Sequence, residues 1–338
     1  MASSPLRASR LCEAAHVAPR SAAIGPFVAW RAGTHSFRSG VSGRIARVIL
    51  AAMILGATSQ LAAQSPVEHL AFDRPESWAL KYFSSVSTFT GLGSPVVREP
   101  WSVELGLEAG WIPHLSDSQR RVGFDGMNLE DLNKTLVFGR PRVAVGLPGG
   151  LSAELGWVPP VEINGQKTNL LAGALERPFL DRADWTLGLR LYGQVGYATG
   201  DFTCSTSVAS QPPGSNGNPL GCNGPSRDTA RLNNAGAALT GGVKIGAGGA
   251  LHFAVGATYN DLAFQVGAVE FGFPDNTRLA THGWTGWAAA GVGWPLGRRL
   301  GFSVEAFYSP LNVVRPPRQD PQNDGLFNVR ALLRYRVF

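Results

Sequence analysis

Four side chains in the sequence are candidates for general acid–base chemistry. His114 lies close to Asp117, and His282 lies close to Asp275. This chemistry needs an imidazole and a carboxylate within hydrogen-bond reach of each other, which neighbouring positions in a sequence do not establish. We therefore interpret these residues first as solvated loop residues. A hydrolase site near one rim of the molecule is the second hypothesis.

Other motifs for catalysis or ligand binding are weak. Gly291-Val292-Gly293 precedes Gly297 with the wrong spacing for a phosphate-binding loop. Calcium prefers oxygen ligands, but the candidate side chains follow no defined spacing. These candidates are Asp261, Asp275, Asn276, Asp320, Asn323 and Asp324. The sequence therefore predicts no metal site and no cofactor. We interpret the protein as a non-enzyme in the first place.

The positive charge of the chain is confined to its beginning. The formal net charge is +6, and residues 1–63 hold seven arginines against the single acid Glu13. The remaining residues therefore carry 23 basic and 23 acidic side chains (30 − 7 and 24 − 1). This balance gives no electrostatic argument for nucleic-acid binding.

Residues 41–63 are typical of a secretory signal peptide. Arg44 and Arg47 precede the apolar stretch 48–55, and Leu61-Ala62-Ala63 supplies the small residues of a cleavage site. The apolar stretch is shorter than the roughly 20 residues of a permanent membrane-spanning helix. We expect cleavage after Ala63, and we interpret residues 1–40 as an unstructured upstream extension.

Export would place the remaining cysteines in an oxidising compartment. Cys12 is removed with the leader, whereas Cys204 and Cys222 flank a segment rich in Pro, Gly, Ser and Asn. An even pair in such a compartment predicts a disulfide that staples a loop.

From residue 99 onward, apolar and polar residues alternate with a period of two, which is typical of strands. Aromatic residues mark both ends of the apolar face, as in the pairs Trp101/Trp111 and Trp185/Tyr197. The connections alternate between short and long, apart from a short one at 163–166, and the even number of strands returns the chain to one side of a membrane. The pattern predicts ten strands: 99–112, 133–147, 150–162, 167–178, 185–199, 233–247, 250–263, 283–294, 300–309 and 325–338. The predicted fold class is all-β, a transmembrane antiparallel up-and-down β-barrel occupying residues 99–338.

The terminal run from Arg330 to Phe338 resembles the last strand of bacterial outer-membrane β-barrel proteins. In that family a final Phe follows alternating apolar residues, and the resemblance implies that the assembly machinery binds this signal. Tyr335 and Val337 share one face here, so Phe338 is out of that register by one residue. The resemblance covers residues 99–338 as a pattern. It implies a location in the outer membrane, with the lipid bilayer and the assembly machinery as partners.

Residues 64–98 depart from the strand pattern. Asp73 to Glu76 combine a cap, a proline at the first helical position and an acid in the first turn, so we expect a short helix over the following residues. This segment would lie in the periplasm or plug the lumen of the barrel. The alternative is an extra strand at 78–90 with a hidden partner near 262–272, which would make twelve strands.

The inward face of the predicted barrel is charged. Opposite charges on neighbouring strands pair, so a salt-bridge network that fills a narrow lumen is the first interpretation. Seven bases against four acids also allow a slightly anion-favouring passage for a small solute. The inward charges are Glu104, Glu108, Arg140, Arg142, Glu154, Arg190, Lys244, Glu305, Arg330, Arg334 and Arg336.

The predicted function is an envelope-structural role or limited passive passage of solutes. One alternative is the hydrolase with His114 and His282 at the extracellular rim. Another is a surface binding protein that acts through its long loops, above all the stapled loop 200–232.

Overall fold

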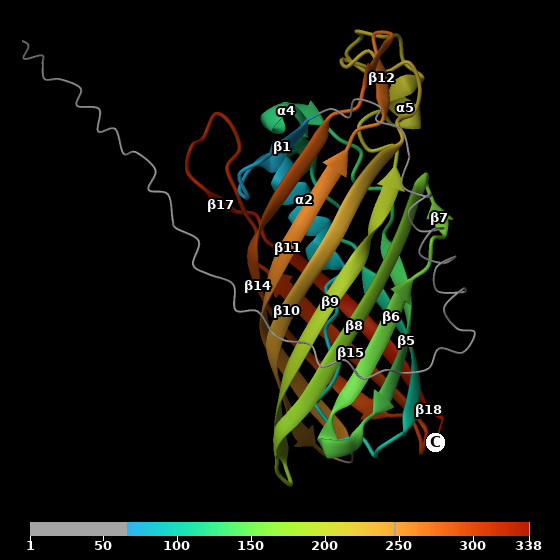
Figure 1. Ribbon diagram of the computed structural model, residues 1–338, viewed down its shortest axis with the longest axis vertical. Coiled ribbons are helices and arrows are strands. Elements are labelled where there is room, and N and C mark those ends of the chain that lie inside the picture. The colour runs from blue at the N-terminus through green and yellow to red at the C-terminus, as the bar shows by residue number, and fades with distance from the viewer. Residues whose placement is uncertain (1–65, 247, 338) are drawn as a thin grey trace, which may run out of the picture. The chain divides into compact units, whose positions relative to one another are not determined.

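The computed structural model describes residues 66–246 and 248–337 (Figure 1). The predicted extension 1–40, the predicted signal peptide and the terminal Phe338 lie outside the described residues. No helix within the described part of the chain is both long and apolar enough to cross a bilayer.

Ten antiparallel strands form a closed barrel within the described residues. The last strand pairs with the first, with Leu333 opposite Leu107. The strands are β2 (Val103–Trp111), β5 (Val137–Gly146), β6 (Ser152–Val158), β8 (Gln166–Asp181), β9 (Trp185–Gly200), β10 (Asp228–Ile245), β11 (Gly249–Gln265), β14 (Arg278–Pro295), β15 (Leu300–Ser309) and β18 (Leu326–Arg336). The predicted ten-stranded all-β barrel is confirmed, and the twelve-stranded alternative is wrong.

Short elements decorate the loops at the end of the barrel that is uppermost in Figure 1. We call this the upper end, and the end that carries the C-terminus the lower end. The short strands are β1 (Val67–His69), β3 (Arg121–Val122), β4 (Asn128–Leu129), β7 (Glu162–Ile163), β12 (Ala268–Glu270), β13 (Phe273–Asp275), β16 (Asn312–Val313) and β17 (Gln322–Asn323). The short helices are α3 (Asp117–Arg120), α4 (Gly123–Gly126) and α5 (Thr206–Ala209), and the turn η1 (Pro148–Gly150) lies at the lower end.

The outer face of the barrel is apolar because alternate residues of each strand point outward. Aliphatic side chains such as Leu107 and Leu191 are more than half exposed there. Exposed aromatic residues lie toward the ends of the strands, and we call the whole surface the apolar belt. Its aromatic residues are Trp111, Trp157, Tyr197, Tyr259, Trp284, Tyr308 and Phe327 toward the upper end, and Trp101, Trp185, Trp294, Phe302 and Tyr335 toward the lower end.

The helix α2 (Pro75–Val86) lies inside the barrel, where it contacts β10, β11, β14 and β18 (Figure 1). Pro75 occupies its first turn beside Glu76, which confirms the predicted helix. Arg74 is the N-cap and makes no side-chain capping bond, so the start of the helix depends on proline geometry and on packing. Trp78 is 1% exposed and stacks on Tyr82, which anchors the helix in the core.

Candidate functional site: the plugged lumen and its outer chamber

The chain continues from α2 through the lumen, and we call residues 75–98 the plug segment. Five arginines of the barrel wall donate hydrogen bonds to its backbone, and we call them the arginine cluster: Arg140 and Arg142 of β5, Arg190 of β9, and Arg330 and Arg334 of β18. Guanidinium groups suit this task because each carries several N–H donors in a fixed fork.

Each backbone carbonyl from Ser87 to Leu92 accepts a hydrogen bond from a barrel side chain. Arg140 Nη2 donates to Ser87 O at 2.6 Å, and Arg142 Nη2 donates to Thr90 O at 2.6 Å. The remaining bonds are Arg330 Nη1 to Thr88 O at 2.5 Å, Arg190 Nε to Phe89 O at 3.3 Å, Arg334 Nη2 to Gly91 O at 2.5 Å, and Ser303 Oγ to Leu92 O at 2.6 Å. The barrel thus satisfies an extended backbone that has no strand partner of its own.

Carboxylates of the wall lie between the arginines. Glu154 Oε1 is 2.9 Å from Arg142 Nε, and Glu154 Oε2 is 2.8 Å from Arg190 Nη2. Glu108 lies 3.4 Å from Arg142 and 3.7 Å from Arg140. These pairs compensate the burial of the charges, because an unpaired charge in the interior is costly.

The ring of Phe89 lies at the centre of this cluster and is fully buried. The guanidinium carbon of Arg142 is 4.2 Å from the ring centroid, and those of Arg140 and Arg190 are each 5.1 Å away. Such distances allow cation–π attraction between this one ring and three guanidinium groups. The plug therefore contributes both carbonyl oxygens and an aromatic face.

The predicted inward charges divide into three groups. Glu108, Arg140, Arg142, Glu154, Arg190, Glu305 and Arg330 are buried together in the lumen. Glu104, Arg334 and Arg336 lie nearer the lower end, where Glu104 is 3.0 Å from Arg98 and 3.7 Å from Arg336. Lys244 differs from the expectation, because it is exposed at the lower end of β10 and makes no ion pair with another described residue.

The sequence argument missed three members of this network. Glu176 lies 3.7 Å from Arg190, and His252 Nε2 lies 3.5 Å from Glu305 Oε2. Arg98, at the end of the plug segment, pairs with Glu104. Glu176 and His252 follow the inward alternation of β8 and β11, so the period-two pattern carried the signal that identifies them.

A cavity of about 470 Å³ lies beside α2 and is lined in part by the loops of the upper end, and we call it the outer chamber. Its apolar lining includes Leu80, Phe83 and Phe264, and its charged lining consists of Arg74 and five acids. The acids are Glu68, Glu76, Asp125, Glu130 and Asp275. Arg74 Nε is 3.2 Å from Asp125 Oδ1 and 3.5 Å from Glu76 Oε2, so this one base is already paired.

Glu130 has a distinctive environment in the outer chamber. It is only 7% exposed, and Asn128 Nδ2 donates to its Oε1 at 2.8 Å, whereas Oε2 has no hydrogen-bond partner among the described residues. Burial raises the pKa of Glu130 to about 8, opposed by the bond from Asn128 and assisted by the charges of Asp228, Glu270 and Glu76. The chamber therefore contains an acid that takes up a proton readily.

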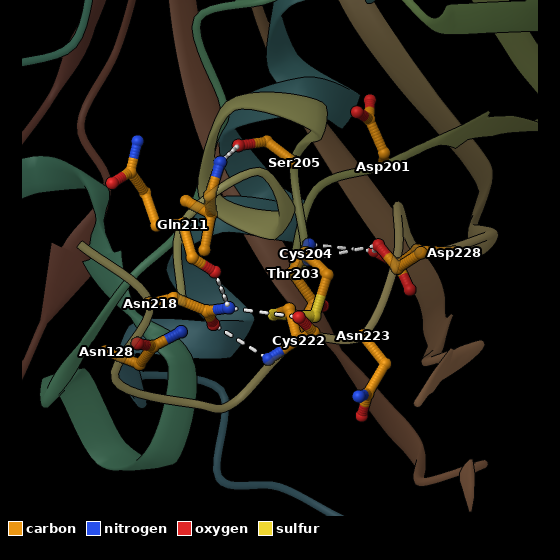
Figure 2. The surroundings of a disulfide bond; sticks show 12 residues. Asn128, Asp201, Thr203, Cys204, Ser205, Gln211, Asn218, Cys222, Asn223 and Asp228 are labelled. Carbon is orange, nitrogen blue, oxygen red and sulfur yellow. Dashed lines mark hydrogen bonds between the residues drawn. A yellow bond between two sulfur atoms is a disulfide. The ribbon is translucent and has the colours of Figure 1, made fainter. Parts of the chain in front are cut away.

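The predicted disulfide between Cys204 and Cys222 is confirmed and staples a loop at the upper end (Figure 2). Asn218 braces this loop, because its Nδ2 donates to Cys222 O at 2.9 Å and its Oδ1 accepts from Cys222 N at 2.7 Å. Asp228 holds the other side by accepting from Thr203 N at 2.8 Å. The stapled loop covers 201–227, shorter than the expected 200–232, because β10 begins at Asp228.

The candidate acid–base residues have separate surroundings. His114 Nε2 lies 3.1 Å from Asn133 Nδ2, and His282 points outward on β14 near the ring of Tyr259. Asp117 contacts Arg120, and Asp275 accepts a bond from Thr277. Within residues 66–246 and 248–337, no group of three or more His, Cys, Asp or Glu side chains has the geometry of a metal site.

The structure describes Tyr335, one of the two residues of the predicted assembly signal. Tyr335 is 44% exposed on the outer face of β18, opposite Leu105 and Leu300. Phe338 lies outside the described residues.

No protein-family model and no curated protein matches the chain. Several solved bacterial barrel structures are similar to it. The outer membrane protease OmpT from Escherichia coli has 10% identity and a TM-score of 0.39, over 75% of this chain and 100% of that one. The translocator domain of autotransporter NalP from Neisseria meningitidis has 12% identity and a TM-score of 0.38, over 79% and 100%. Ail, the attachment invasion locus protein of Yersinia pestis, has 9% identity and a TM-score of 0.27, over 70% and 99%.

Proposed function

We propose that the chain is an outer-membrane β-barrel whose lumen is closed by its own plug segment, and that it serves as a structural and binding protein of the envelope. The apolar belt supports the membrane location, because lipid-facing apolar residues flanked by aromatic residues are expected of transmembrane barrels. The connections agree, since four of them are short at the lower end, at 147–151, 182–184, 246–248 and 296–299.

The closed lumen rests on one observation, the donation of hydrogen bonds to six consecutive plug carbonyls. Charge-assisted hydrogen bonds are about twice as strong as neutral ones. An ion or solute would have to displace the plug from several of them together in order to pass. We therefore favour a closed barrel over limited passive passage, although both belong to the functions expected from the sequence.

Single-channel recording in planar bilayers tests this proposal. The chain from Gln64 onward should give no steady openings, whereas a variant lacking residues 66–98 should conduct. The matched control removes 205–221 of the stapled loop and leaves the plug intact, so it should stay silent. Steady openings of the unaltered chain would contradict the closed lumen, and retarded migration of unheated samples would show that each variant is folded.

We propose as a second function that the outer chamber binds a small molecule with an ammonium group on an apolar body. The supporting observation is Glu130 Oε2, a buried oxygen without a described partner in a chamber whose wall carries five acids and one base. An ammonium group would supply the missing donor and, as a neighbouring positive charge, would favour the ionised form of Glu130 over the protonated form that burial favours. The apolar lining would cover a hydrophobic body. Pockets of this kind orient a ligand through a few polar groups.

Calorimetric titration with benzylamine, and with benzyl alcohol as its neutral counterpart, tests this second function. Benzylamine should bind more tightly than the alcohol, and Glu130→Gln should weaken amine binding about tenfold, equivalent to about 1.4 kcal/mol. Asp261→Asn, which removes an exposed acid outside the chamber, is the matched control. Equal binding of the amine to the protein and to Glu130→Gln would refute the role of Glu130.

A further inference from the structure

The barrel wall is incompletely paired between β5 and β6. Their ladder runs only from Gly146 opposite Ser152 to Arg142 opposite Gly156. On its other side β5 pairs with β2 as far as Val137, opposite Trp111. Residues 137–141 of β5 therefore have a strand partner on one side only among the described ladders.

Two prolines explain where this ladder ends. Leu136 O and Gly146 N bond toward the β2 side, so the odd-numbered residues of β5 direct their backbone groups toward β6. Continuing the register beyond Val143 opposite Leu155 would place Pro141 opposite Trp157, and Gly139 opposite Pro159. Each of these next two pairs would lack one N–H, because proline has no backbone donor.

The unpaired stretch is closed again at its upper end. Asn164, in the turn between β7 and β8, donates from Nδ2 to Lys134 O at 2.8 Å. Lys134 Nζ in turn lies 2.8 Å from Asp201 Oδ1. The gap between β5 and β6 is therefore a bounded opening in the wall, and we call it the wall window.

A cavity of about 270 Å³ fills the wall window and joins the outer surface to the plug. At the outside it is lined by Val137, Val161 and Ile163, which are 57%, 61% and 44% exposed. On the inside it reaches Val86 of α2 and Leu170, which are buried. The lining is mostly apolar from one side of the wall to the other.

The wall window faces the apolar belt. Its β5 edge lies beside β2 residues from Leu107, opposite Pro141, to Trp111, opposite Val137, and both are exposed members of the belt. Backbone groups at an open sheet edge need partners where they meet lipid, because hydrocarbon offers none. Val137 and Gly139 direct such groups into the opening.

We propose that the wall window is a binding site for a single-chain amphiphile that enters sideways from the outer leaflet of the membrane. The hydrocarbon chain occupies the apolar cavity as far as α2, and the polar headgroup hydrogen-bonds the free backbone groups of Val137 and Gly139. The site rests on the outer-membrane placement proposed above.

Photo-cross-linking tests this proposal with the full mature chain in phosphatidylcholine nanodiscs. The probe is a palmitic acid with a diazirine in its chain, and a lysophosphatidylcholine with the same chain forms a second arm. We expect label on the plug peptide 82–98. Outside the wall window, the barrel wall separates this peptide from lipid. Label from the first probe alone would identify a fatty acid as the ligand, and label from both would mean that any single chain fits.

Blocking variants show whether the probe passes through the window. Gly139 is outward-facing, and an added Cβ would meet only Glu108 O, at 4.0 Å, so Gly139→Trp should fill the opening and reduce plug labelling at least tenfold. Gly286→Trp, also outward-facing in open space, is the matched control and should leave labelling unchanged. If Gly139→Trp does not fold, Val161→Trp on the opposite rim serves the same purpose.

Labelling of the outer face separates the two proposals. Label on outward residues of β9 such as Leu191, without label on the plug peptide, would overturn the window while supporting the membrane placement. Plug labelling that persists in a folded Gly139→Trp or Val161→Trp variant would also overturn it, because the probe would then enter from the outer chamber. An absence of label on both surfaces would count against the membrane placement itself.

Discussion

Arg142 Nη2 donates to Thr90 O at 2.6 Å while Arg142 Nε lies 2.9 Å from Glu154 Oε1. One guanidinium thus links the main chain of the plug to a carboxylate of the neighbouring strand. The acceptor on the plug is a backbone atom, so this contact does not depend on which side chain occupies position 90. The side chains that fix the plug belong to the barrel wall. Substituting the wall arginines should therefore weaken the binding of the plug.

Arg330→Met should destabilise the folded barrel by about 3 kcal/mol, because removing one member of a buried charged network leaves the others unpaired. Arg330 donates to both Thr88 O and Ser85 O. Urea unfolding in detergent, followed by tryptophan fluorescence, gives the free energy of unfolding. Arg231→Met removes an exposed pair with Asp261 and should change this free energy by less than about 1 kcal/mol. Equal effects of the two substitutions would mean that the arginine cluster does not hold the plug.

The double variant Cys204→Ser/Cys222→Ser should loosen the stapled loop and leave the barrel folded. A link across 18 residues restricts the unfolded loop by about 3 kcal/mol in the chain-entropy model. Limited proteolysis should therefore cut the variant within 205–221 much faster than the oxidised protein. Reduction of the unaltered protein should give the same cleavage pattern, and equal cleavage rates in all three samples would show that Asn218 and Asp228 hold the loop without the disulfide.

The strands could be predicted well where the outward side chains of a strand belong to the apolar belt. The expected strands 185–199 and 300–309 agree closely with β9 and β15, because outward leucines and aromatics alternate there with polar residues. The start of β10 was predicted five residues too late, at 233 in place of Asp228. In that upper part the alternation is inverted, since Ala230 is buried inside while Arg231 is exposed outside. β6 ends at Val158, four residues before the expected 162, because Pro159 has no N–H to continue the ladder.

The site was harder to predict than the fold because its main acceptors are backbone carbonyls. Every residue has a backbone carbonyl, so the sequence does not show which carbonyls accept hydrogen bonds from side chains. The only related signal in the sequence was the excess of inward arginines over inward acids. In the sequence argument that excess supports only the second interpretation of the lumen, a slightly anion-favouring passage, after a salt-bridge network that fills it. In the structure it corresponds to the carbonyls of Ser87 to Leu92, which take the donors that no carboxylate uses.

Glu130 should make the upper loops less stable as pH rises. Its pKa is raised from 4.5 to about 8, chiefly by burial, so the folded state holds a proton that the unfolded state has released. The contribution of Glu130 to stability is therefore greatest below pH 4.5, falls between pH 4.5 and about 8, and levels off above that. Glu130→Gln should remove this slope and stabilise the protein at pH 9 by more than about 1.4 kcal/mol, the value of one pKa unit. Unfolding measured at pH 5 and pH 9 for both proteins checks this, and parallel slopes would exclude Glu130 as their source.

Leu191→Arg should impair insertion into a bilayer. Leu191 lies midway along β9 between the aromatic ends Trp185 and Tyr197, and it is 52% exposed with Leu175 and Ala237 beside it on the neighbouring strands. An arginine at the midplane of a lipid-facing surface costs roughly 2–4 kcal/mol, whereas the same change near water costs little. Phe273→Arg, in the exposed β12–β13 hairpin at the upper end, is the matched control, because Phe273 is 75% exposed away from the belt. Folding into dimyristoyl phosphatidylcholine vesicles, measured by the fraction of protein resistant to trypsin, should fall for Leu191→Arg alone. If both variants insert as well as the unaltered chain, the apolar belt does not lie in lipid, and some other apolar partner must cover it.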